Sequence, residues 1–168
     1  MSGIENISLR SPDLKDGMAV FNLIANCAPL DTNSSYCNLL QCSHFSTTSV
    51  VALQGDDVVG FISGYSIPDR PNTLFVWQVA VSQKARGLGL ASLMLSHILH
   101  RPSNGHIEYL ETSITEENQP SWKLFKSFAK KNRATFTSSE WMHKHTHFDG
   151  AHDSEWLVRI GPFITKTN

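Results

Sequence analysis

The sequence predicts a single domain of mixed α/β class spanning residues 1–168. One observation is the run at 73–81 (TLFVWQVAV), which is apolar enough for a central strand buried on both faces. A second is the recurrence of apolar residues at helical spacing in 90–100 and 120–131. The third is the composition of this 168-residue chain, 40% hydrophobic and 17% charged, which excludes a disordered or fibrous protein.

The first elements are helical after a short strand. Residues 4–9 alternate loosely and predict a first strand. Ser11, Pro12 and Asp13 form a helix-start signature, with Ser11 as the cap and Pro12 at the first helical position, so we expect a helix over 12–26. Pro29 ends it, and a second short helix is expected over 34–42.

A meander of three strands comes next, and helices and strands then alternate. A hairpin turn at 55–57 separates the first two strands of the meander, and a loop at 68–72 precedes the third. The stretch between the last two strands, 138–153, is rich in histidine and receives no assignment. The expected elements are strands at 49–53, 58–67, 73–81, 107–114, 134–138 and 155–160 and helices at 90–100 and 120–131.

Charge is unevenly distributed along the chain, although the formal net charge is only −1. Residues 1–83 hold three basic and seven acidic side chains, whereas residues 84–133 hold eight basic and four acidic ones. The small net charge argues against a nucleic-acid partner. The basic middle suits an anionic ligand and the acidic start a cationic one, although chance clustering on solvated helix faces gives the same pattern.

The cysteines and the N-terminus indicate a cytoplasmic protein. Cys27, Cys37 and Cys42 are odd in number and fit no zinc spacing. Residues 1–10 have no apolar core for a signal peptide, and no apolar run is long enough to span a membrane. We therefore expect reduced thiols, no membrane and a cytoplasmic location.

The segment between strand 73–81 and the next helix has the properties of a pyrophosphate cradle. Its glycines let backbone N–H groups approach an anion, the helix N-terminus adds partial positive charge, and Lys84 and Arg86 add side-chain charge. The glycine pattern of a Rossmann turn and that of a Walker loop are both absent. A glycine-rich turn without a ligand is the alternative. The residues expected to form the cradle are Val79, Ala80, Val81, Arg86, Gly87, Leu88, Gly89, Leu90 and Ala91.

The cradle resembles that of the GNAT acetyltransferases. Their pattern is Arg or Gln, two residues, Gly, one residue, then Gly or Ala, and Arg86, Gly89 and Ala91 match it. The resemblance implies the GNAT fold, a mixed and mostly antiparallel sheet flanked by helices, with acetyl-CoA as cosubstrate. It also implies that Asn118 contacts the pantetheine arm. Phe125 stands where the family often has a tyrosine that protonates the leaving thiolate.

Longer stretches are similar to the GNAT enzymes that acetylate L-2,4-diaminobutyrate. They are residues 30–36 (LDTNSSY), 42–45 (CSHF), 71–81 (PNTLFVWQVAV) and 152–162 (HDSEWLVRIGP). This resemblance implies acetylation of the 4-amino group in the biosynthesis of ectoine, a compatible solute made under osmotic stress, and it implies a homodimer. Another small amine or diamino acid as acceptor, and a module that binds acetyl-CoA without catalysis, are the alternatives.

The chemistry needs a proton acceptor, because an alkyl ammonium titrates near ~10 and attacks a thioester only as the free base. Asp31, Glu111 and Glu116 are candidate partners for the ammonium groups, with a helix cap or turn as the alternative for Asp31. We favour Glu111 as ammonium partner or base, because a carboxylate within an apolar strand is costly unless used or paired; an outward-facing strand residue is the alternative. His152 is a candidate base or carboxylate ligand. The resemblance points to the backbone around Val79 as the oxyanion donor.

Aromatic residues are candidates for the remaining roles. Trp77 and Tyr36 could wall the acceptor pocket, and core packing is the alternative for Trp77. Tyr36 is our first choice for the general acid, with Tyr65 and Tyr109 left open. Cys37 or Cys42 as a covalent carrier has no adjacent base in the sequence, so direct amine attack is expected. His143, His145 and His147 alternate as zinc or nickel ligands can, but no metal is expected.

Overall fold

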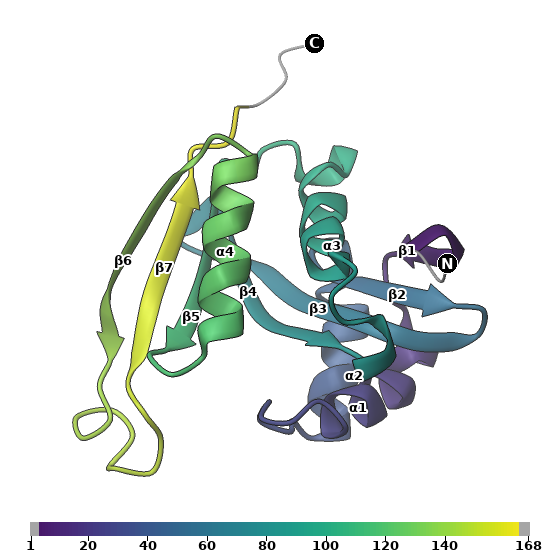
Figure 1. Ribbon diagram of the computed structural model, residues 1–168, viewed down its shortest axis with the longest axis horizontal. Helices are drawn as coiled ribbons and strands as arrows, with labels where there is room; N and C mark the ends of the chain where they lie inside the picture. Colours follow the sequence, from purple (N-terminus) through teal and green to yellow (C-terminus); the bar gives the residue numbers. More distant parts are fainter. Residues whose placement is uncertain (1–3, 165–168) are drawn as a thin grey trace. The chain divides into compact units, whose positions relative to one another are not determined.

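A computed structural model of the chain describes residues 4–164 (Figure 1). The strands follow the hydrogen-bonded order β1-β2-β3-β4-β5-β7-β6 in a seven-stranded sheet. β4 and β5 run parallel, whereas β1–β2, β2–β3, β5–β7 and β6–β7 are antiparallel pairs, so the predicted mixed and mostly antiparallel sheet is confirmed. The chain groups into two compact units, Met1–Tyr65 with Trp77–Gly105 and Ser66–Val76 with His106–Asn168.

The first unit begins with a short helix, η1 (Ile4–Asn6), the strand β1 (Ile7–Arg10) and the turn η2 (Leu14–Asp16), which leads into α1 (Gly17–Ala25). The helix cap is Asp13 rather than the predicted Ser11, so Pro12 lies outside the helix. Asp13 accepts a hydrogen bond from the Lys15 backbone N–H, and Asp16 accepts one from the Asp13 N–H. This reciprocal capping box satisfies two N–H donors that Ser11 would have left unpaired, which explains the difference.

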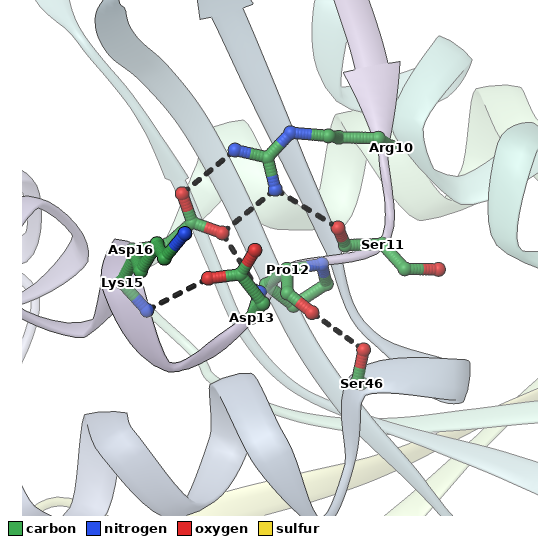
Figure 2. A network of polar contacts seen from close by, with 7 residues as sticks. All are labelled: Arg10, Ser11, Pro12, Asp13, Lys15, Asp16 and Ser46. Atoms are coloured by element: carbon green, nitrogen blue, oxygen red, sulfur yellow. Dashed lines mark hydrogen bonds and ion pairs between the residues drawn. The ribbon is translucent and has the colours of Figure 1, made fainter.

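Arg10 fixes this capping box to the end of β1 (Figure 2). Its two guanidinium nitrogens donate to the two Asp16 carboxylate oxygens at 2.7 and 2.8 Å. These hydrogen bonds hold the pKa of Asp16 below its usual range, against the effect of burial and with help from the Asp13 N–H. Ser46 adds a hydrogen bond to the Pro12 carbonyl, as Figure 2 also shows.

Helices cover both faces of the strands in this unit. The next elements are α2 (Ser35–Ser43), η3 (Ser46–Thr48), β2 (Val50–Gln54) and β3 (Asp57–Ile67). α1 and α2 lie side by side and share a buried cluster with Val51 and Phe61 (Figure 1). On the opposite face Ala52 pairs with Gly60, and a methyl group on Gly60 would lie 3.0 Å from Met94 of α3 (Leu90–Leu99). Strand alternation therefore separates two helix-covered faces.

β4 (Arg70–Val81) is longer than predicted and is not buried throughout. The expected loop at 68–72 is replaced by a tight turn, because 70–72 already belong to the strand. Residues 73–76 are buried, but Trp77 is 44% exposed, so the prediction of a strand buried on both faces is wrong for its second half. The first half belongs to the second unit and the second half to the first.

The second unit contains β5 (Tyr109–Thr115), α4 (Gln119–Lys131), β6 (Thr135–Met142) and β7 (Glu155–Gly161). α4 packs on the face formed by Leu110, Ile160 and Phe136, since Trp122 of α4 meets Phe136 and these three residues are aligned across the strands (Figure 1). β6 runs further than the predicted 134–138, and residues 143–154 form turns and coil. Among residues 4–164, no helix is long and apolar enough to cross a membrane.

Candidate active site

The predicted cradle lies in the first unit, between the end of β4 and α3. A short helix, η4 (Gln83–Ala85), is followed by Arg86 in extended conformation and by Gly87 and Gly89 at φ of 77° and 76°. Such left-handed φ values are strained for any residue with a Cβ, so both positions favour glycine. Gly89 is the N-cap of α3, which places the unpaired first N–H groups of that helix beside the glycines.

The space in front of the glycines suits a phosphate group. Apart from the chain neighbours, a methyl group at Gly87 or Gly89 would meet no atom within 4 Å. Ser82 places a buried hydroxyl without a hydrogen-bond partner at the start of the loop. Backbone N–H donors at glycines and at a helix N-terminus are groups that bind an anion.

The basic side chains of the cradle have partners of their own. The Arg86 Nε donates to the Val81 carbonyl at 3.1 Å, and this hydrogen bond orients the guanidinium group of the exposed side chain. Lys84 forms an ion pair with Asp57 at 3.0 Å. The sequence predicted that Lys84 would add charge to the cradle, but Asp57 already balances that charge.

Beside the cradle strand, an aromatic row leads to the exposed Trp77. Tyr65 meets the Trp77 ring edge to face with centroids 6.3 Å apart, and Phe45 packs on Tyr65 at 5.9 Å. Burial raises the pKa of the Tyr65 phenol, so this group stays protonated at neutral pH. The exposed indole of Trp77 is thus supported from one side by Tyr65 and Phe45.

The loop that carries Asp31 is held against β4. The Gln78 side chain donates from Nε2 to the Asp31 carbonyl at 2.8 Å and accepts at Oε1 from Asn33 at 2.7 Å. Ser34 then caps α2 by accepting from the Cys37 N–H, and Tyr36 follows with 69% of its surface exposed. The structure therefore holds the Asp31 loop against Gln78, the residue that follows Trp77 in β4.

Glu111 has a different environment from the one predicted. It is only 2% exposed, and its carboxylate accepts hydrogen bonds from Arg70 at 2.6 and 2.9 Å and from Arg159 at 2.5 Å. Burial acts to raise the pKa of this carboxyl, but the two arginines outweigh burial and leave the pKa lowered. A carboxylate neutralised by two arginines is a weak base and a poor ammonium ligand, so the geometry argues against the role we favoured.

The other predicted residues of the second unit have identifiable local contacts. The His152 Nδ1 lies 2.6 Å from the Asp153 carbonyl and therefore carries the proton, while its Nε2 lies 3.8 Å from Glu155. Asn118 caps α4 by accepting from the Ser121 N–H at 3.2 Å. Phe125 is a buried core residue of α4. Tyr109 stacks under the Arg159 guanidinium at 3.8 Å, which makes it a support for the Glu111 cluster.

The histidine-rich segment is a loop, so its imidazoles do not alternate on a strand. The His143 backbone N–H donates to His147 Nδ1, which occupies that ring nitrogen. Within residues 4–164 no group of three or more His, Cys, Asp or Glu side chains is placed to hold a metal ion.

The thiols show no sign of activation. Cys27 and Cys42 are buried, and burial raises the pKa of Cys42 to about 12, with smaller effects from neighbouring charges. Burial also raises the pKa of the half-buried Cys37. Because the thiolate is the nucleophilic form, these values argue against a covalent cysteine carrier.

Comparison with known proteins decides the family. A model of the acetyltransferase (GNAT) family matches residues 18–129. The chain belongs to the GNAT acetyltransferase family. The L-2,4-diaminobutyric acid acetyltransferase of Methylotuvimicrobium alcaliphilum is 54% identical over 94% of this chain and 91% of its own length. The Vibrio cholerae enzyme of the same name is 48% identical over 90% of this chain and 87% of its own.

Solved structures extend the comparison to the fold. The diaminobutyrate acetyltransferase EctA of Paenibacillus lautus, solved with its substrate L-2,4-diaminobutyric acid and coenzyme A, has a TM-score of 0.90 and 34% identity over 96% of this chain and 98% of its own. Arabidopsis thaliana Naa50 has a TM-score of 0.69 at 18% identity, over 92% of this chain and 97% of its own, and shows the fold alone. The predicted GNAT fold is thereby confirmed.

Two sets of contacts around the predicted site residues were not expected from the sequence. Gln78 was quoted within a motif but given no role, although a polar residue in an otherwise apolar strand was a usable signal. No local sequence pattern indicated the partners of Glu111, because Arg70 and Arg159 lie 41 and 48 positions away in the chain.

Proposed function

We propose that this acetyltransferase transfers the acetyl group of acetyl-CoA to the 4-amino group of L-2,4-diaminobutyrate, giving N4-acetyl-L-2,4-diaminobutyrate for ectoine biosynthesis. The observation that carries the proposal is the match to a solved enzyme with both diaminobutyric acid and coenzyme A, which extends over 96% of this chain. Curated relatives at 48–54% identity carry the same name.

Acetyl-CoA supplies the thioester whose carbonyl carbon accepts the amine. In this chain the N–H groups at Gly87, Gly89 and the first turn of α3 would hold the pyrophosphate, with Arg86 at its side. The backbone around Val79 is the proposed hydrogen-bond donor to the oxyanion, and Asn118 the proposed contact of the pantetheine arm.

The acceptor site is built from residues near the second half of β4. Asp31 is the proposed partner of an ammonium group, and the exposed Trp77 and Tyr36 are the proposed aromatic wall, which would favour cations. The amine loses its proton before it attacks, to water or to His152, whose Nε2 is the acceptor nitrogen when Nδ1 carries the proton. Glu111 is left out of this assignment because its two arginines neutralise it.

A protonated phenol would supply the leaving thiolate with its proton. Tyr36 was the first choice from sequence, and Tyr65 competes with it because it lies against Trp77, although its raised pKa makes it the weaker acid. Tyr65→Phe and Tyr36→Phe separate the two. The variant that lacks the acid loses kcat and keeps its affinity for coenzyme A.

Thiol release from acetyl-CoA with a panel of amines tests the function. The panel is L-2,4-diaminobutyrate, ornithine, lysine, putrescine and a basic peptide, and NMR locates the acetyl group on the product. We expect turnover confined to diaminobutyrate, with acetyl on the 4-nitrogen. Turnover on another amine would contradict the substrate, and binding of coenzyme A without turnover would contradict the reaction.

Matched glycine substitutions test the cradle in the same assay. Gly89→Ala and Gly55→Ala introduce a Cβ at similar left-handed φ values of 76° and 61°, and neither meets another atom within 4 Å. Both changes cost about 1–2 kcal/mol of backbone strain. Only Gly89→Ala should raise the KM for acetyl-CoA, by about tenfold, and an equal KM in both variants would exclude this loop as the binding site.

One further property follows from the resemblance to diaminobutyrate acetyltransferases, and a second from the cysteine content of the sequence. We propose a homodimer, which light scattering of the purified protein tests directly; a monomeric mass would contradict it. The proposed location is the cytoplasm, where acetyl-CoA is available, and fractionation of the source cells checks it.

A further inference from the structure

The side chain of Gln78 connects the loop at 31–33 to β4. Its amide uses both ends at once: Nε2 donates to the Asp31 carbonyl at 2.8 Å, and Oε1 accepts from the Asn33 Nδ2 at 2.7 Å. The three residues form what we term the Gln78 clamp.

The strand side of the clamp is itself anchored. The Gln78 backbone N–H donates to the Ser63 hydroxyl at 3.2 Å, and Ser63 is completely buried. The residue before Gln78 is Trp77, whose ring rests on Tyr65. The clamp therefore joins the Asp31 loop to a fixed point of β4, one residue from the aromatic wall.

We propose that Gln78 is a positioning residue that sets the distance between Asp31 and the aromatic wall, and thereby selects the length of the diamine acceptor. This inference rests on the proposed function, because it assigns Asp31 and Trp77 to the acceptor site. Both ends of a short diamino acid must be held at once, so a displaced loop changes the spacing that the substrate has to match.

The chemistry of the clamp explains why glutamine stands here. A glutamate keeps the acceptor for Asn33 but loses the donor to the Asp31 carbonyl and places a negative charge against that carbonyl oxygen. An apolar residue loses both bonds. The glutamine amide donates and accepts from one planar group of this length, whereas the glutamate in Gln78→Glu only accepts, so that change opens the loop side of the clamp.

Steady-state kinetics of Gln78→Glu, with Gln54→Glu as matched control, test the proposal. Gln54 lies at the exposed end of β2 and undergoes the same change of charge. We expect the KM for diaminobutyrate to rise about tenfold in Gln78→Glu, with the KM for acetyl-CoA within about twofold of wild type. The preference for diaminobutyrate over ornithine, which is one methylene longer, should fall by a similar factor.

A second variant and a measurement independent of activity complete the test. Asn33→Ala removes the other bond of the clamp and should shift the same KM in the same direction. Hydrogen exchange of the amides at 31–34 should quicken in Gln78→Glu and remain unchanged in Gln54→Glu.

The outcomes separate this inference from the proposed function. A wild type that does not acetylate diaminobutyrate contradicts the function; the clamp is then judged by hydrogen exchange, and unchanged exchange in Gln78→Glu overturns it. A wild type active on diaminobutyrate, with equal rises in both KM values in Gln78→Glu, overturns the positioning role alone. An unchanged preference over ornithine overturns the selection of acceptor length.

Discussion

Two buried carboxylates in this acetyltransferase, Asp16 and Glu111, are held by arginine and differ in where their partners come from. In the first unit, Asp16 takes two hydrogen bonds from Arg10 and one from the Asp13 N–H, all within six residues. In the second unit, Glu111 takes its bonds from Arg70 and Arg159 on two neighbouring strands. The pKa of each carboxyl lies below its ordinary value.

The difference shows what a local pattern can reveal about a charged residue. The contacts of Asp16 all come from residues 10–16, so the sequence alone indicates a helix cap in this segment. The predicted cap was Ser11, whereas the observed one is Asp13. Glu111 acquires its partners only when β5 pairs with its neighbours. The sequence suggested an ammonium partner or a base for this carboxylate, whereas its partners in the structure are two arginines of the same chain.

The largest expected effect is the loss of stability in Glu111→Gln. The neutral amide leaves two arginines facing a site built for a carboxylate, which costs about 3 kcal/mol in the free energy of unfolding. Urea unfolding followed by fluorescence measures it. The control is Glu108→Gln, which changes an exposed glutamate bound to Asn72 and should cost less than about 1 kcal/mol.

The same variant distinguishes a structural Glu111 from a catalytic one. If Glu111 acts only in the fold, the folded fraction of Glu111→Gln keeps its kcat within about threefold of wild type. A variant of unchanged stability with kcat reduced a hundredfold or more would restore Glu111 as the base and overturn this comparison.

A smaller loss is expected for Asp16→Asn. The amide still accepts from the Asp13 N–H but weakens the paired bonds to Arg10, so the free energy of unfolding falls by about 1–2 kcal/mol. Asp56→Asn, in the exposed hairpin turn, is the matched control for lost charge. A loss larger than that of Glu111→Gln would contradict the ranking of the two clusters.

Acid should remove the contributions of ionised Asp16 and ionised Glu111 to the free energy of unfolding. Because each folded-state pKa is depressed, its stabilisation is complete above the unfolded pKa of about 4 and is lost as the pH falls through the lower folded value. The stability gap between wild type and either variant should therefore shrink below about pH 4, by up to about 1.4 kcal/mol per pH unit for each carboxyl. A gap that stays constant down to pH 2 would contradict the direction of both shifts.

The smallest effect is expected for Arg70→Lys. Arg70 is about half exposed and holds Glu111 through two parallel bonds, of which a lysine can replace only one. We expect a loss below about 1 kcal/mol, measured by the same urea titration, because Arg159 remains in place. A loss equal to that of Glu111→Gln would mean that Arg70 alone holds the carboxylate.

The sequence predicted the class of fold and the glycine turn between β4 and α3 because both depend on neighbours in the chain. The apolar period of α3 and the glycines at 87 and 89 were sufficient for a helix N-terminus at the end of a strand. Strand 70–72 was missed because Arg, Pro and Asn favour loops, and its pairing with β5 overrides that preference. Trp77 was assigned to a buried strand because hydrophobicity alone does not distinguish a core residue from an exposed aromatic one.

The burial of the thiols has a consequence for the lifetime of the enzyme. Every turnover of the proposed reaction releases coenzyme A, whose thiol can form mixed disulfides with protein cysteines when conditions become oxidising. Such exchange requires both a reachable sulfur and a thiolate. Cys27 and Cys42 are buried, and with a pKa of about 12 Cys42 remains protonated at any physiological pH. The core is thereby protected from inactivation by the enzyme's own product.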